Sequence, residues 1–281
     1  MVAAGSSHRK RASWLARVSP RGAPISTYLT CPNSSGHLSE HRIKKSDLLR
    51  FYGAGPYRND SALLHVSGDS QYLVQGPNAR RLKYAPVLCT QCNTTATQPF
   101  DYAYESFIRW VFDDEELALR RRFIDFAEIY GDDFEESQRN LFKYFAKSFG
   151  CRLANDGFNV PADVVDLLGK EHFETALSLT FAVNEDMLIV PPEWRGIGKG
   201  QLVGWAARET PDVTTGVTWD EHVSWLSVYY WYHEWPNGRL GSRWIANSQF
   251  VYLGSFTTLT PEMRAEAIAK TALLEGAKRD N

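Results

Sequence analysis

Two short segments, residues 38–41 and 87–93, constrain this chain more than any other feature. The first places a carboxylate directly before an imidazole. The second contains two cysteines separated by two residues and followed by an asparagine. Thiolates suit a structural zinc ion, carboxylate and amide oxygens suit a hard divalent cation, and an imidazole is a general base. We therefore predict that the two segments fold against each other around metal ions.

The cysteines indicate a structural zinc site. Cys89 and Cys92 supply two of the four ligands that a tetrahedral zinc needs, and Cys31 is an obvious third. His37 is a candidate fourth ligand, because a turn separates it from Cys31. Cys151 is a weaker candidate, since it falls near the end of a predicted long helix. A redox role for the pair is disfavoured because no βαβ pattern surrounds it.

Charge is distributed unequally along the 281 residues. Residues 1–100 carry 13 Lys and Arg against 4 Asp and Glu, a net +9. Residues 101–281 carry 18 against 29, a net −11. Without the five Arg and Lys of the N-terminal arm, residues 22–100 still carry +4. The basic part holds both metal-binding segments, which favours a polyanionic partner such as nucleic acid.

The residue composition and the hydrophobic pattern change along the chain, and together they predict an α+β protein. A Ser-, Gly-, Pro- and Arg-rich start reads as a flexible basic arm. No apolar stretch of signal-peptide or membrane-span length follows it, so we expect a cytoplasmic protein without membrane contact. The predicted units are the arm at 1–24, a module carrying both segments at 25–112, a helical connector at 113–153 and an α+β domain of unknown role at 154–281.

Local patterns predict the elements inside these units. In the first 153 residues we expect a strand at 26–30, a short helix at 46–51, a hairpin of 62–66 with 71–75, and helices at 101–112, 114–130 and 133–152, with Asp101 as the cap of the first. Beyond them we expect helices at 161–168 and 261–275 and strands at 175–183, 187–190, 202–208, 222–232 and 244–253. Aromatic residues between 225 and 235 are predicted to be core, with base stacking or a small-molecule pocket as alternatives.

The two segments together resemble the HNH, or His-Me finger, nuclease family. The shared pattern is a cysteine, then Glu-His on the first strand, then a C-x-x-C followed by Asn that opens a helix. The likeness covers about residues 28–112 and implies a zinc-supported ββα-metal finger, with helices 113–153 as a buttress. Three features depart from the family pattern: a single Cys31 before the first strand, a long gap from His41 to Cys89, and no secure match to the middle asparagine.

The resemblance also implies roles for individual residues. His41 would be the general base, and Glu40 and Asn93 would hold one catalytic Mg²⁺ or Mn²⁺. Asn78 is the nearest candidate for orienting His41. The structural zinc would be held by Cys31, Cys89 and Cys92, with His37 as the candidate fourth ligand.

Six cations flank these residues and are candidate contacts to substrate phosphates, with a solvated charged loop as the alternative. They are Arg42, Lys44, Lys45, Arg80, Arg81 and Lys83.

The family resemblance leads us to expect a metal-dependent endonuclease, with DNA favoured over RNA. Two alternatives remain open: a non-catalytic zinc module that binds nucleic acid, and a sensor whose C-terminal domain binds a ligand, a protein partner or a second copy of the chain.

Overall fold

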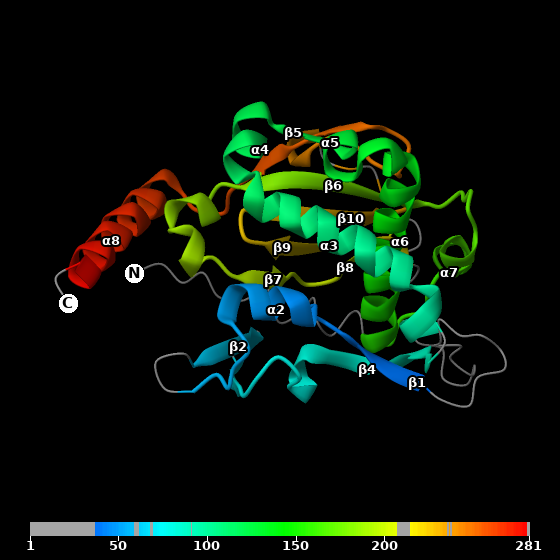
Figure 1. Cartoon of the computed structure of the whole chain (residues 1–281), viewed down its shortest axis with the longest axis horizontal. Helices are drawn as coiled ribbons and strands as arrows, with labels where there is room; N and C mark the ends of the chain where they lie inside the picture. The colour runs from blue at the N-terminus through cyan, green and yellow to red at the C-terminus, as the bar shows by residue number, and fades with distance from the viewer. Residues whose placement is uncertain are drawn as a thin grey trace.

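The computed structural model shows a mixed α+β protein (Figure 1) and describes residues 37–58, 62–67, 70–90, 92–206, 214–234, 236 and 238–279. The predicted arm at 1–24 and the predicted strand at 26–30 lie outside the described residues. So does Cys31.

The described residues of the N-terminal part include two strand pairs and one α-helix. The strands β1 (His37–His41) and β4 (Lys83–Cys89) pair antiparallel, and helix α2 (Lys45–Tyr52) follows β1 directly. The strands β2 (Leu63–Ser67) and β3 (Ser70–Val74) form a hairpin. The predicted short helix and hairpin are thereby confirmed. The hairpin lies beside α2 in Figure 1, and its residues line a cavity together with those of strand β7 (Ile197–Lys199).

The helices that follow agree with prediction only in part. Helix α3 begins at Gln98 rather than at Asp101, and Thr97 precedes it, so the predicted cap at Asp101 is wrong. The predicted helix 114–130 is interrupted, because Arg122 adopts a left-handed backbone with φ of 57° and a short strand follows. The observed elements are a π-helical turn η3 (Cys92–Ala96), α3 (Gln98–Asp113), α4 (Glu115–Arg121), β5 (Phe123–Asp125), α5 (Phe126–Tyr130), α6 (Phe134–Asn155) and α7 (Ala162–Gly169).

The C-terminal strands form a mostly antiparallel sheet in the order β12-β6-β10-β9-β7, with β8 also paired to β9. The predicted strand at 222–232 is two strands, because Ser224 turns the chain with a positive φ. The predicted strand at 187–190 is a 3₁₀ turn over residues 187–189. Of the predicted strand at 244–253, only the end forms a strand. The strands are β6 (Leu177–Asn184), β8 (Val203–Ala206), β9 (Thr214–Val223), β10 (Leu226–Tyr232), β11 (Phe250–Tyr252), which pairs with β5, and β12 (Gly254–Phe256).

One large hydrophobic core joins the helices to this sheet. Phe107 of α3 and Phe145 of α6 pack against Phe181 of β6, and all three are buried. Trp225 and Tyr230 lie in the same core, which confirms the core interpretation of these two aromatic residues. The core crosses the predicted unit boundaries at 112 and 153. We refer to residues 98–256 as the body and to residues 37–97 as the N-terminal module.

Helix α8 (Pro261–Arg279) projects away from the body (Figure 1). Its described residues include four large exposed apolar side chains, those of Met263, Ile268, Leu273 and Leu274. None of the helices in the described part of the chain has the length and apolarity that crossing a membrane requires.

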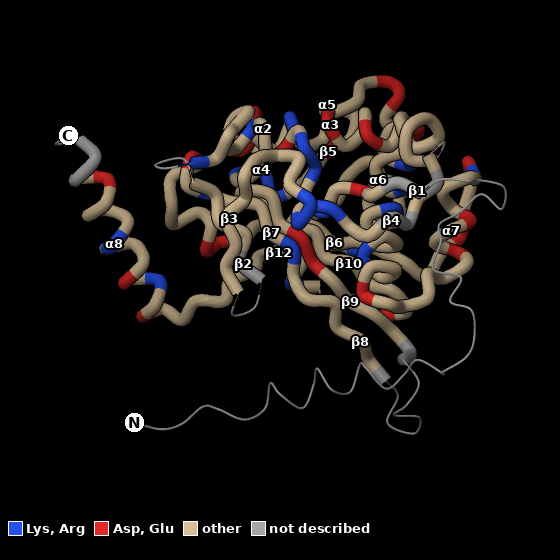
Figure 2. The backbone as a smooth tube through the Cα atoms, turned by 90° about the horizontal axis from the view of Figure 1, so that it is seen from below, with Lys and Arg blue, Asp and Glu red and all other residues tan. Residues whose placement is uncertain are grey.

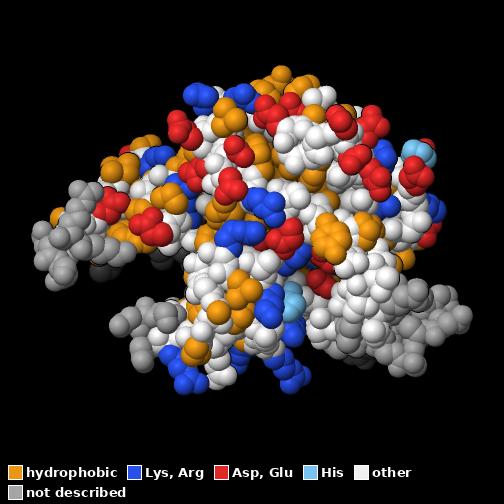
Figure 3. Space-filling view, in the orientation of Figure 1, with side chains coloured by type: hydrophobic (Ala, Val, Ile, Leu, Met, Phe, Trp, Pro, Cys, Tyr) orange, Lys and Arg blue, Asp and Glu red, His pale blue; other side chains and the backbone are white. Residues whose placement is uncertain are grey.

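The charge asymmetry of the sequence is visible on the surface. In Figure 3, Lys and Arg side chains gather along the lower edge, where the N-terminal module lies, and Asp and Glu side chains concentrate over the helices of the upper part. A polyanion would therefore be attracted to the N-terminal module rather than to the body.

Candidate active site

The pairing of β1 with β4 brings together the two segments that the sequence singled out, residues 38–41 and 87–93. His37 lies opposite Cys89 and Leu38 opposite Leu88, while the register shifts on both sides of Ser39. Strand β4 then runs through η3, which contains the half-buried Asn93, into helix α3. Two neighbouring strands and a following helix thus carry the residues that the sequence singled out.

The zinc ligands cannot be placed with the same detail. The side chains of His37, Cys89 and Cys92 lie outside the described residues, as does Cys31, so the zinc site stays a prediction. Within the described residues, no group of three or more His, Cys, Asp or Glu is arranged to hold a metal ion. Cys151 is a free cysteine fully buried in α6, and burial raises the pKa of its thiol to about 12.

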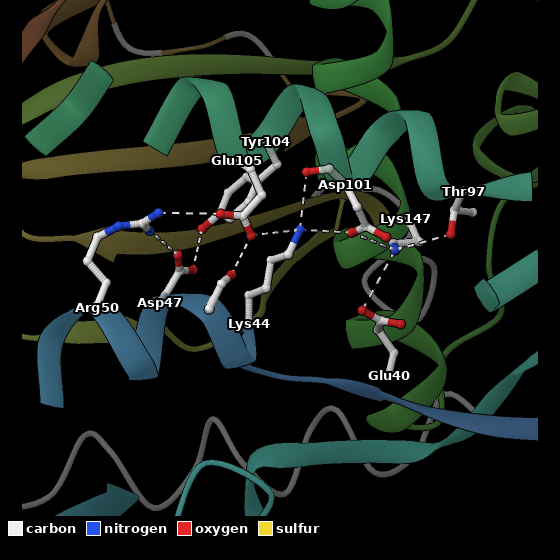
Figure 4. Close-up of polar contacts among 10 residues, drawn as sticks. Glu40, Lys44, Asp47, Arg50, Thr97, Asp101, Tyr104, Glu105 and Lys147 are labelled. Carbon is white, nitrogen blue, oxygen red and sulfur yellow. Dashed lines mark hydrogen bonds and ion pairs between the residues drawn. The ribbon is translucent and has the colours of Figure 1, made fainter. Parts of the chain in front are cut away.

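Glu40 points from β1 toward helices α3 and α6 (Figure 4). Its Oε1 lies 3.7 Å from Nζ of Lys147, and Oδ1 of Asp101 lies 3.5 Å from the same nitrogen. Burial raises the pKa of Glu40, and the Lys147 ammonium partly offsets that effect. Carboxylate oxygens from β1 and α3 therefore converge on one positive charge supplied by α6.

Lys147 is nearly inaccessible, with 2% of its side chain exposed. Besides the two carboxylates, its ammonium donates to Oγ1 of Thr97 at 3.5 Å. A lysine buried to this extent is rare unless it is paired, because removing an ammonium group from water is costly. The three oxygen partners account for its burial.

The polar contacts continue from Asp101 along α2 and α3 (Figure 4). Nζ of Lys44 lies 3.1 Å from Oδ1 of Asp101 and 3.3 Å from Oε1 of Glu105. Asp47, which is 1% exposed, accepts a hydrogen bond of 2.7 Å from the Tyr104 hydroxyl and pairs with Arg50 at 3.1 Å. These contacts fix α2, and with it the end of β1, against α3.

His41 has the protonation behaviour that a general base requires. Burial lowers the pKa of its imidazole, and the charges of Lys83 and Lys45 lower it further. The ring is therefore mainly neutral at pH 7 and has one nitrogen free to accept a proton. Its Nδ1 is buried and has no hydrogen-bond partner among the described residues. Asn78 is exposed in the turn after β3, and its orienting role stays a prediction.

The six predicted phosphate-binding cations divide into two groups. Lys44 is engaged by carboxylates as described, and Arg42 donates to the Lys83 carbonyl at 3.2 Å and to Asn155 Oδ1 at 3.2 Å. The side chains of Lys45, Arg80 and Arg81 are exposed, and that of Lys83 is half-buried. The second group is accessible to an incoming phosphate.

Sequence reasoning missed the contribution of the body to this site. Lys147 comes far after Asn93 in the sequence, outside the region of family resemblance. A signal was present, because helical spacing places Lys147 on the same face of α6 as Cys151 and Ala154, two apolar residues opposite the phenylalanine face. A charged residue on such a face calls for a buried partner of opposite charge.

Comparison with family models, curated proteins and solved structures found no match to the chain.

Proposed function

We propose that the chain is a metal-dependent endonuclease of the HNH kind, which hydrolyses phosphodiester bonds, with DNA favoured over RNA. The observation that carries the proposal is the antiparallel pairing of β1 with β4, which brings Glu40 and His41 next to the strand that leads into the Cys89-x-x-Cys92-Asn93 segment. The order of two paired strands followed by a helix is the one that the resemblance implies.

His41 would act on the attacking water. Its neutral imidazole accepts the proton from water as the new oxygen–phosphorus bond forms, which makes the water a stronger nucleophile. The lowered pKa keeps the ring ready to accept that proton at neutral pH. The neighbouring charges of Lys83 and Lys45 also favour the approach of a phosphate.

The oxygen donors near His41 suit a hard divalent cation. Glu40 and Asp101 already converge on a positive charge, and Mg²⁺ is commonly held through one or two carboxylates together with substrate phosphates. Glu40 and Asn93 would hold the ion, with Asp101 as an additional candidate. Such a cation supplies stabilisation of negative charge on the phosphate and on the leaving oxygen.

The test is cleavage of supercoiled plasmid by His41→Ala. We expect wild-type protein to nick plasmid in Mg²⁺ or Mn²⁺ and to lose activity with a chelator. Loss of a general base lowers the rate about 10²–10⁴-fold. His172→Ala is the matched control, because His172 is exposed and remote in the sequence from the site. Circular dichroism would establish that both variants are folded.

Nicking by His41→Ala at the wild-type rate would exclude His41 as the base. Metal analysis of the purified protein addresses the zinc site separately. About one zinc per chain is expected if Cys31, Cys89 and Cys92 bind a structural ion.

A second function, nucleic-acid binding without cleavage, is favoured by one observation. The carboxylate of Glu40 already has a cation of the protein itself, Lys147, as its neighbour. This alternative predicts that wild-type protein and His41→Ala bind DNA equally and that neither cleaves it in Mg²⁺ or Mn²⁺. Binding that weakens steeply with salt would fit phosphate contacts in either case.

A further inference from the structure

A cavity of about 380 Å³ lies between the N-terminal module and the body. Its walls come from the segment between β1 and α2, from α2 itself, from the β2–β3 hairpin, from the 3₁₀ turn η2 (Arg80–Leu82) and the start of β4, from the end of α6, and from β7 with the two residues that follow it. Figure 2, seen from below, shows the hairpin beside β7, which is where the two parts meet. The volume falls at the lower end of the range for small-molecule sites, roughly 300–1,000 Å³.

The polar side of the cavity is strongly basic. Four cationic side chains line it: Arg42, Arg81, Arg152 and Lys199. Lys199 pairs with Glu221 at 2.5 Å, and Nε of Arg152 lies 2.9 Å from Oδ2 of Asp156, so these two charges are balanced.

The other two cations have neutral neighbours. Arg42 donates to a backbone carbonyl and to the amide oxygen of Asn155. The Arg81 guanidinium stacks on the Tyr72 ring, 3.6 Å from its centroid. In the described ranges, no carboxylate pairs with either guanidinium. The cavity therefore has an excess of positive charge.

Two buried polar atoms at the cavity have neither a hydrogen-bond partner nor an ion-pair partner among the described residues. They are the hydroxyl of Tyr84, a residue only 2% exposed, and Nδ1 of His65. Burial raises the pKa of Tyr84, so its hydroxyl keeps its proton and can donate a hydrogen bond. Burial and the nearby Arg42 and Arg81 lower the pKa of His65. A buried hydroxyl without a partner costs free energy unless a bound group supplies an acceptor.

The rest of the cavity lining is largely apolar. It is formed by aliphatic side chains that include Leu48, Leu63, Val74, Leu82 and Ile197. The site thus offers guanidinium and hydroxyl donors for an anion next to a surface for a flat or apolar group. Guanidinium groups recognise phosphate through paired hydrogen bonds.

We propose that this cavity binds a phosphorylated small molecule of mononucleotide size, with the phosphate held by Arg42, Arg81 and Tyr84 and the apolar portion against the aliphatic wall. Such a ligand contacts both the module and the body. The ligand would also lie against Arg42, the residue that follows His41. The binding itself does not require the nuclease activity proposed above, so each idea can fail without the other.

The experiment is calorimetric titration of the full chain with the four nucleoside 5′-monophosphates and with inorganic phosphate. We expect one saturable site for at least one monophosphate and weaker binding of phosphate alone. Arg81→Gln should weaken binding about ten-fold, as expected for a charged hydrogen bond. Tyr84→Phe should also weaken it while leaving the melting temperature unchanged or higher, because the hydroxyl has no partner within the described part of the unliganded chain.

Arg120→Gln is the matched control, since it removes one exposed arginine of the body that does not line this cavity. It should bind as the wild type does. A 5′-phosphorylated oligonucleotide is the further probe. Binding of the oligonucleotide without any monophosphate would overturn the proposal, as would equal affinities of the wild type, Arg81→Gln and Tyr84→Phe. Absence of binding by every probe would overturn it too.

Discussion

The N-terminal module and the body are stabilised in different ways. The body shares one continuous core of aromatic and aliphatic side chains. The described residues of the module form only two small clusters, and one of them is completed by Cys151 and Ala154 of α6. Ion pairs and hydrogen bonds to α3 and α6 supply much of the remaining contact. The candidate active site therefore lies where a weakly packed unit rests on a strongly packed one.

This difference bears on how the site works. Local opening is easiest where few apolar contacts are buried and where contacts are mainly polar. The nuclease proposed above would have to admit a large substrate, and opening of the module against the body would offer a way to do so. The body in turn supplies Lys147, which pairs with Glu40, and Asp101, which pairs with the same lysine.

The largest effect is expected in the body. Phe145→Ala should lower the free energy of unfolding by about 3–5 kcal/mol, because it leaves a cavity among buried aromatic rings. Leu82→Ala in the module should cost clearly less, toward the low end for leucine, because its small cluster can collapse around the missing atoms. Urea unfolding measures both. Equal losses for the two variants would contradict the contrast between the parts.

A second effect concerns pH and tests the buried carboxylate of α2. Burial raises the pKa of Asp47 from 3.8 to about 6. The native state then holds the proton more tightly than the unfolded chain, so this group lowers stability as pH rises from about 4 to about 6. Over that range the loss amounts to at most about 3 kcal/mol.

Asp47→Asn should therefore flatten the decline in stability between these pH values. The measurement is the urea midpoint of both proteins at pH 4.5 and pH 7. If the difference between the two proteins were the same at each pH, Asp47 would not titrate in this range.

The smallest effect is expected at the junction. Removing one partner from a fully buried ion pair is strongly destabilising, because the other charge is left buried alone. Lys147→Met should destabilise the chain less than that, because Glu40 and Asp101 retain partial access to water. Amide exchange in β1 should become faster. Lys143→Met is the control, since the Lys143 ammonium lies over the Phe100 ring and makes no carboxylate ion pair in the described chain. Unchanged exchange in β1 would show that Lys147 does not hold the strand.

Periodicity predicted the elements whose stability is local. The helices α6, α7 and α8 and the β2–β3 hairpin follow from patterns within one segment. The single helix predicted at 114–130 was wrong because β5 pairs with β11, a strand from the far end of the body. A tertiary partner of this kind leaves no trace in the local pattern and overrides helix propensity.

At the candidate site, too, the sequence predicted the contributions of nearby segments but not those of distant ones. The motif residues identified the strand that carries Glu40 and His41 and its pairing with the strand near Cys89. They did not identify Lys147, because the fold alone decides which residue of a distant helix meets Glu40. The cavity beside Arg42 could not be predicted from the sequence either, because separate regions of the chain form it.

The separation of Glu40 from Lys147 along the chain also matters during protein synthesis. The lysine is translated long after the glutamate, because α2, the hairpin, β4 and α3 all come between them. At elongation rates of roughly 5–20 residues per second, β1 waits on the order of ten seconds before its counter-charge leaves the ribosome. Until then Glu40 lacks the buried ammonium group that it meets in the folded chain. The nascent polypeptide accordingly completes the proposed catalytic centre only after the helices on which that centre depends have been made.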